Sequence, residues 1–262
     1  QLGDVQGNGT GVVAFDKQTG KVIYSVSNEL ASYASPTLAR AGGRNWCFVF
    51  ARGGLIGFNP DNGQMDFHYP WRASRLESVN ASNPVVAGNR VFISETYGPG
   101  SSLLDFKSGK VEVVWQDSSK TRRKAMQTHW NTPIYHNGFL YGSSGRNSAN
   151  AELRCIDWET GEVQWSEKNL ARCSLLYVDG HFVCLGEYGK LRLLRANPEK
   201  FEQVAETVLL QQDPGEGERP LQYPAWAAPI LSHGLLYVRG QDRLVCLEFI
   251  PDRKALPETS KP

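Results

Sequence analysis

Residues 155–165, CIDWETGEVQW, repeat the pattern of residues 14–24, AFDKQTGKVIY, and this pair decides the fold. In each copy an Asp ends one apolar run, a Gly follows it within the turn, and an aromatic residue ends the next run. The Asp can accept hydrogen bonds from the turn amides, and the Gly allows a positive φ angle. The pattern predicts a β-hairpin whose last aromatic side chain docks on a neighbouring unit. Weaker copies occupy residues 57–67 and 104–115.

A second marker repeats along the chain, in which a small or polar residue precedes a proline and an aliphatic pair. These dipeptides are Ser35-Pro36, Asn83-Pro84, Thr132-Pro133 and Ala228-Pro229. The prolines are separated by 48, 49 and 96 residues, so a unit without a proline begins near Arg172. The repeat is about 48 residues long, which is typical of a β-propeller blade.

Each repeat contains four short apolar runs, separated by turn residues rich in Gly, Asn and Asp. Four antiparallel strands in such a period predict an all-β protein, a β-propeller of four-stranded blades. The only helix that the sequence predicts is a short one over residues 197–201, where Pro198 suits a first helical turn.

The repeat boundaries predict one β-propeller over residues 1–250 and a disordered tail over residues 251–262. Complete blades are expected at about 36–70, 84–117, 133–168 and 173–210, and partial blades at 11–26 and 227–249. The propeller is therefore predicted to be incomplete, or to be closed by its N- and C-terminal strands.

The hairpin pattern at residues 14–24 and 155–165 resembles the pyrroloquinoline-quinone-like repeat, the tryptophan docking motif of quinoprotein-type β-propellers. The resemblance covers about residues 11–250 and is strongest to non-catalytic bacterial members, including the outer-membrane assembly lipoprotein. It implies an extracytoplasmic location, periplasmic or secreted.

Charge and apolar runs exclude several classes of protein. The chain of 262 residues has 28 Lys and Arg against 27 Asp and Glu, a net charge of +1. No strong field therefore attracts nucleic acid. The longest apolar run, residues 46–51, is far below the roughly 18 residues that span a bilayer. We expect neither nucleic-acid binding nor direct membrane insertion. The five cysteines show no spacing for zinc, and no metal site is expected.

In propellers, the loops that enter the innermost strands and the loops between second and third strands share one face. Unusual polar and aromatic residues occupy both loop sets here, and we expect them to form a partner-binding face. They are Tyr33, Arg52, Asn80, Tyr97, His129, Trp130, Arg146, Arg172, Tyr188, Trp226 and Arg239. Two interpretations stay open for Trp130 and Trp226, which either contact a ligand or pack between blades and cap the channel. A structural role is favoured for His129, because no second ligand lies at metal spacing.

Two functions remain. The first is a non-catalytic binding scaffold that presents its loop face to a protein, peptide or glycan partner. The second, implied by the resemblance, is a dehydrogenase that depends on pyrroloquinoline quinone and Ca²⁺. Its weak candidate ligands are Glu95, Asn131 and Glu187, whose spacing does not require them to converge. The adjacent cysteine pair that such enzymes generally carry is missing from the sequence, so the scaffold is favoured, with no catalytic residue and no cofactor.

Overall fold

The computed structural model describes residues 6–213 and 217–249. Their regular structure consists of β-strands and one short 3₁₀ helix, η1 (Ser148–Asn150). Within these residues no helix is long and apolar enough to cross a membrane. The helix predicted over residues 197–201 is wrong. The Asn197 side chain accepts the amide of Glu199 at 2.9 Å and holds this segment in a turn.

Four consecutive antiparallel sheets have four strands each, and each falls within one predicted repeat. Sheet II contains β3 (Thr37–Ala41), β4 (Arg44–Phe50), β5 (Gly54–Phe58) and β6 (Met65–Pro70), and sheet III contains β7 (Val85–Ala87), β8 (Arg90–Glu95), β9 (Gly100–Lys107) and β10 (Lys110–Gln116). Sheet IV contains β11 (Ile134–His136), β12 (Phe139–Ser144), β13 (Glu152–Asp157) and β14 (Val163–Glu167), and sheet V contains β15 (Cys173–Val178), β16 (His181–Gly186), β17 (Lys190–Arg195) and β18 (Gln203–Val208).

Smaller sheets flank these four. Sheet I is the hairpin of β1 (Val12–Phe15) and β2 (Val22–Val26), and sheet VI contains β21 (Ile230–Ser232), β22 (Leu235–Arg239) and β23 (Leu244–Glu248). A separate hairpin of β19 (Leu210–Asp213) and β20 (Gly217–Pro220) lies between sheets V and VI in the chain.

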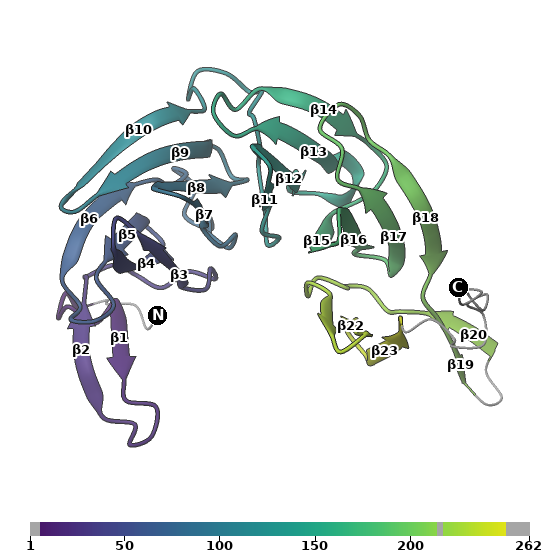
Figure 1. Cartoon of the computed structure of the whole chain (residues 1–262), viewed down its shortest axis with the longest axis horizontal. Coiled ribbons are helices and arrows are strands. Elements are labelled where there is room, and N and C mark those ends of the chain that lie inside the picture. Colours follow the sequence, from purple (N-terminus) through teal and green to yellow (C-terminus); the bar gives the residue numbers. More distant parts are fainter. Residues whose placement is uncertain (1–5, 214–216, 250–262) are drawn as a thin grey trace, which may run out of the picture.

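The sheets follow one another around an arc, with sheet I at one end and sheet VI at the other (Figure 1). The predicted all-β propeller architecture is confirmed. Among the described residues, no strand of sheet I pairs with a strand of sheet VI. The tail predicted to be disordered, residues 251–262, lies outside the described residues.

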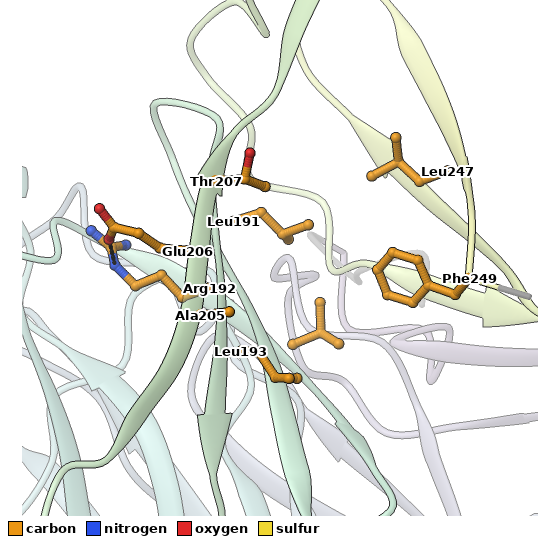
Figure 2. A pocket seen from close by; sticks show the side chains of 9 residues that line it. Leu191, Arg192, Leu193, Ala205, Glu206, Thr207, Leu247 and Phe249 are labelled. Carbon is orange, nitrogen blue, oxygen red and sulfur yellow. Dashed lines mark hydrogen bonds and ion pairs between the residues drawn. The ribbon is translucent and has the colours of Figure 1, made fainter. Parts of the chain in front are cut away.

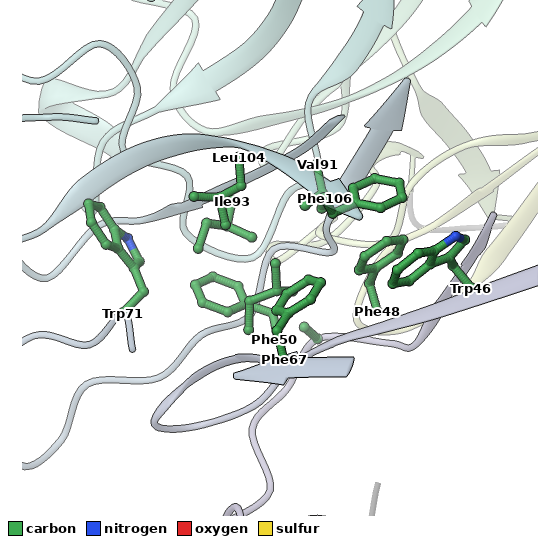
Figure 3. Close-up of a cluster of buried hydrophobic side chains, with 11 residues drawn as sticks. Trp46, Phe48, Phe50, Phe67, Trp71, Val91, Ile93, Leu104 and Phe106 are labelled. Atoms are coloured by element: carbon green, nitrogen blue, oxygen red, sulfur yellow. The ribbon is translucent and has the colours of Figure 1, made fainter. Parts of the chain in front are cut away.

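The core lies between neighbouring sheets. The second strand of each four-stranded sheet has a run of consecutive buried residues, because both of its faces are covered. Between sheets II and III, Trp46 and Phe48 of β4 meet the ring of Phe106, whose centroid lies 4.8 and 4.7 Å from theirs (Figure 3). Face-to-face packing of this kind fixes each blade against the next.

In sheets I to IV the outer strand carries the repeat aromatic at one register position, next to a β-bulge. The residues there are Tyr24, Phe67, Trp115, Trp165 and, in sheet V, Ala205. The indole nitrogen of Trp115 donates to the carbonyl of Trp158 in the next sheet at 2.9 Å. Gly161 in that turn has a φ of 74°, and a Cβ there would lie 2.9 Å from the Trp115 ring. Only glycine therefore suits both the turn and the docked ring.

The last interface lacks this contact. Ala205 leaves an apolar groove of about 280 Å³ between sheets V and VI. The side chains of Leu191 and Leu193 on β17 line one side, and Leu247 and Phe249 line the other (Figure 2). At this interface the repeat therefore lacks both the aromatic residue in its sequence and the docked ring in its packing.

Candidate functional site

Nine polar and aromatic residues of sheets III to VI lie together, and we call them the Arg172 cluster. They belong to the loops that enter the innermost strands and to the loops between second and third strands. Its members are Tyr97, His129, Trp130, Arg146, Arg172, Glu187, Tyr188, Tyr223 and Trp226. All but Glu187 and Tyr223 belong to the predicted partner-binding face; Glu187 was predicted as a cofactor ligand.

A buried ion pair forms the centre of the cluster. Arg172 precedes β15 and Glu187 follows β16, so the pairing of these two strands places them side by side. The Arg172 Nη2 atom lies 2.6 Å from the Glu187 carboxylate, and its Nε lies 3.0 Å from the same oxygen. Arg172 is 7% exposed and Glu187 is 0% exposed. The indole nitrogen of Trp226 also donates to Glu187, at 3.2 Å. The pair therefore joins sheet V to the loop that enters sheet VI.

Both members of the pair are charged. Burial opposes ionisation of Glu187, but hydrogen bonds from Arg172, Ser148 and Trp226 outweigh it and lower the pKa of the carboxyl group. Burial likewise opposes the Arg172 charge, and Glu187 outweighs it and raises the pKa of the guanidinium. A carboxylate fixed in this way is a poor general base, since it is held ionised by its partners.

His129 is neutral. Arg172 can only donate, and its Nη1 lies 3.0 Å from Nδ1 of His129, so Nδ1 is the unprotonated nitrogen. Nε2 then carries the hydrogen and donates to the Tyr97 hydroxyl at 3.2 Å. Burial and the charges of Arg172 and Arg146 lower the pKa of His129 to about 4. His129 serves as a fixed connector between sheets III and V.

Four aromatic rings form a continuous stack beside the ion pair. Trp130 stacks on Trp226 with ring centroids 5.5 Å apart, and Tyr188 stacks on Tyr223 at 5.1 Å. Tyr223 meets Trp226 edge to face at 6.1 Å and so joins the two pairs. Tyr188, Tyr223 and Trp226 are 55%, 43% and 40% exposed, which leaves apolar ring surface in contact with solvent.

A cavity of about 420 Å³ adjoins this stack, lined by the loops that enter the innermost strands of sheets II to VI. The residue before each repeat proline lies in its wall, and three of these four residues are polar. Asn83 accepts the amide of Ser35 on its side-chain oxygen at 2.7 Å, and the Asn83 amide donates to the Thr132 hydroxyl at 3.1 Å. These bonds link successive sheets around the channel. Trp130 and Trp226 line the same cavity.

The other four predicted face residues lie outside the cluster. Tyr33 lines the cavity and is 76% exposed. Asn80 is buried, and its side chain donates to the carbonyls of Ala51 and Trp71, so it holds loops together. Arg52 donates to the carbonyl of Leu76, and Arg239 is exposed at the end of β22.

The three candidate cofactor ligands are each engaged within the protein. Glu95 accepts the amides of Tyr97, Gly98 and Gly100 in its own loop, and burial raises its pKa although these bonds oppose the shift. Asn131 donates to the carbonyl of Ser143, and Glu187 pairs with Arg172. No hydrogen bond or ion pair among the described residues joins any two of the three. The described part of the chain also contains no group of three or more His, Cys, Asp or Glu suited to a metal.

Sequence reasoning did not select three residues of the cavity wall, Ser35, Asn83 and Thr132. A signal for them exists, because each is the polar residue immediately before a repeat proline. Equivalent positions in successive blades face the same channel, so this marker could have identified them.

Successive four-stranded sheets, a docked aromatic residue and a loop face around a channel define a β-propeller of quinoprotein-type repeats. The PQQ_2 family model, described as "Outer membrane protein assembly factor BamB", matches residues 4–167. The chain therefore belongs to this family. No curated protein matches the chain.

Solved structures with similar folds have low sequence identity to the chain and support the fold alone. BamB from Moraxella catarrhalis aligns with a TM-score of 0.58 and 12% identity, over 95% of this chain and 72% of that one. The Cps50 (Swd1) β-propeller domain of Myceliophteria thermophila aligns with a TM-score of 0.57 and 13% identity, over 90% and 76%. The computationally designed Ika8 protein aligns with a TM-score of 0.55 and 12% identity, over 92% and 78%.

Proposed function

We propose that the protein is a non-catalytic, extracytoplasmic binding scaffold whose loop face, centred on the Arg172 cluster, holds a protein, peptide or glycan partner. One observation carries this proposal: exposed rings of Tyr188, Tyr223 and Trp226 are gathered beside the buried Arg172–Glu187 ion pair, which is hydrogen-bonded to Trp226 and Tyr223. Aromatic residues anchored in this way are typical of binding surfaces, because ordering them costs little entropy. Membership in a family described as an assembly factor supports the scaffold and the location outside the cytoplasm.

The absence of a quinone is part of the proposal. Pyrroloquinoline quinone is a polyanion that needs a metal and basic side chains around it. The carboxylates of Glu95 and Glu187 are occupied by protein donors, which supports a face without a cofactor.

Photo-crosslinking tests the loop face directly. A benzophenone amino acid is placed at Tyr188, on the face, or at Ile23, which is 61% exposed on β2 of sheet I. The full chain is irradiated with the envelope fraction of the producing cells, and adducts are identified by mass spectrometry. We expect a discrete adduct from position 188 that is absent from position 23 and is lost with Trp226→Ala. Equal adducts from both positions, or none from position 188, would contradict the proposal.

A titration with pyrroloquinoline quinone and Ca²⁺ tests the dehydrogenase. Thermal unfolding and quinone absorbance are followed together, since a ligand of the folded state raises the melting temperature. We expect no shift. A saturable shift that Glu95→Ala or Glu187→Ala abolishes would overturn the non-catalytic assignment.

A further inference from the structure

The channel cavity has the dimensions and chemistry of a small-molecule site. Its volume of about 420 Å³ lies within the roughly 300–1,000 Å³ that is typical of ligand pockets. Five successive sheets contribute to its wall, so the packing of the blades fixes its shape. The site is therefore built by the rigid scaffold and not by one mobile loop.

Several hydrogen-bond donors in the wall have no partner among the described residues, and the buried indole nitrogen of Trp130 is one of them. The side-chain oxygen of Asn83 accepts the backbone amide of Ser35, and the Thr132 hydroxyl oxygen accepts the backbone amide of Asn83. The Asn83 Nδ2 group and the Thr132 hydroxyl hydrogen have no partner in the part of the chain that the structure describes. An apolar ligand would cover these donors without satisfying them, which is unfavourable. The ligand must therefore offer hydrogen-bond acceptors.

The wall also offers flat apolar surface. Trp226 is 40% exposed and stacks on Trp130, and both rings line the cavity. Tyr33, contributed by sheet II, is 76% exposed and lines the same cavity. Rings held in this way favour a ligand with a flat C–H face.

Charge excludes an ionic ligand. None of the described residues that line the cavity is an Asp, Glu, Lys or Arg. The Arg172 guanidinium lies over the Trp226 ring at 5.3 Å and is already neutralised by Glu187. A carboxylate or phosphate would lose its hydration here without gaining a cation, which is costly. The ligand is therefore uncharged.

We infer that the cavity binds a neutral saccharide with equatorial hydroxyl groups. One pyranose ring lies on Trp226, and its hydroxyls accept from Asn83 Nδ2 and from Thr132. The inference rests on the proposed function, because it names a glycan as the occupant of the loop face.

Cellotriose, a flat and uncharged β-linked saccharide, is the probe. Titration of the full chain is followed by tryptophan fluorescence and by calorimetry. We expect saturable binding that Trp226→Ala weakens by at least about tenfold. Asn83→Asp keeps the acceptor for Ser35, replaces the free donor by a charged oxygen, and should weaken binding similarly. Phe15→Ala, which removes a ring that is 51% exposed in sheet I, should leave binding unchanged.

The outcomes separate this inference from the proposed function. Absence of cellotriose binding to the native chain, or equal binding by all three variants, overturns the saccharide inference. If a protein or peptide adduct still forms at position 188, the scaffold function stands without the saccharide. If neither cellotriose nor an adduct is found, both fail.

Discussion

Sheet V meets its two neighbours in different ways. At the interface with sheet IV, the outer rim is closed by Trp165, whose indole nitrogen donates to the Asn197 carbonyl at 2.9 Å and whose ring meets Phe201 edge to face. At the interface with sheet VI, the same register position is Ala205, and an open groove remains.

The interface between sheets V and VI is stabilised instead by hydrogen bonds of the Arg172 cluster. Glu187 receives the indole N–H of Trp226, its carbonyl accepts the amide of Ala225 at 2.9 Å, and Arg172 reaches the Tyr223 hydroxyl at 3.3 Å. A small apolar core around Leu185 and Leu236 completes the contact. The candidate site therefore also holds sheet VI against sheet V. The effect of a substitution on binding must be separated from its effect on the free energy of unfolding.

The largest expected effect comes from breaking the Arg172–Glu187 pair. Glu187→Ala leaves the Arg172 charge buried without a counter-ion, and we expect the free energy of unfolding to fall by about 3–5 kcal/mol. Urea denaturation measures the loss, and hydrogen exchange should show faster exchange in β21–β23 than in β11–β14. The double variant Arg172→Met/Glu187→Leu removes both charges and should recover most of the loss. A single-variant loss below about 1 kcal/mol would mean that the pair does not fasten sheet VI.

Removal of the outer-rim contact should have the next largest effect. Trp165→Ala deletes a partly buried indole together with its hydrogen bond to Asn197, and we expect a loss of about 3 kcal/mol in urea denaturation. Gln164→Ala, at the neighbouring exposed position, should change the free energy of unfolding by less than about 0.5 kcal/mol. Equal effects of the two variants would contradict a docking role for the aromatic residue.

Acidification should destabilise the Arg172 cluster, because His129 would gain a proton beside Arg172. Its pKa in the folded protein is about 4, whereas an unfolded histidine titrates near 6.5. The unfolded chain therefore binds the proton first, so the stabilisation is complete above about pH 6.5 and is lost as the pH falls towards 4. We expect a loss of about 2 kcal/mol across this window. Denaturation at a series of pH values measures it, and His129→Gln should flatten the profile. An unchanged profile would show that other groups cause the dependence.

The repeat made the sheets predictable, because each hairpin turn is determined locally. Asp157, for example, accepts the amides of Glu159 and Thr160 at 2.9 and 2.8 Å within its own turn. The helix over residues 197–201 was predicted wrongly because the Asn197 side chain accepts the amide of Glu199, and this local bond favours a turn over a helix. The Asn197 carbonyl also accepts the Trp165 indole of another strand.

The loop face was predictable only as a set of residues. Blade symmetry places Arg172 and Trp226 on one face, but the sequence does not reveal that both meet Glu187. That meeting depends on how two sheets pack and on which way each side chain turns, and neither is set by a local pattern. The free donor of Asn83 likewise emerges only when the bonds to Ser35 and Thr132 are known.

The smallest expected effect would transfer the outer-rim contact to the last interface. Ala205→Trp places an indole at the register position of Trp165, facing the groove between Leu193 and Phe249. We expect a gain of about 1 kcal/mol in the free energy of unfolding, as is typical of cavity filling. Val204→Trp is the matched control, because Val204 is 47% exposed and does not line the groove, and it should give no gain.

The coupling of the two contacts sharpens this last prediction. Both an outer aromatic residue and the Arg172–Glu187 pair would stabilise the contact between sheets V and VI. If they do so in a coupled way, Ala205→Trp should reduce the loss in free energy of unfolding caused by Glu187→Ala, and the two changes should not be additive. Additive changes in the free energy of unfolding would mean that the two contacts stabilise the interface independently. A loss of stability on Ala205→Trp alone would mean that the groove is not a vacant docking position.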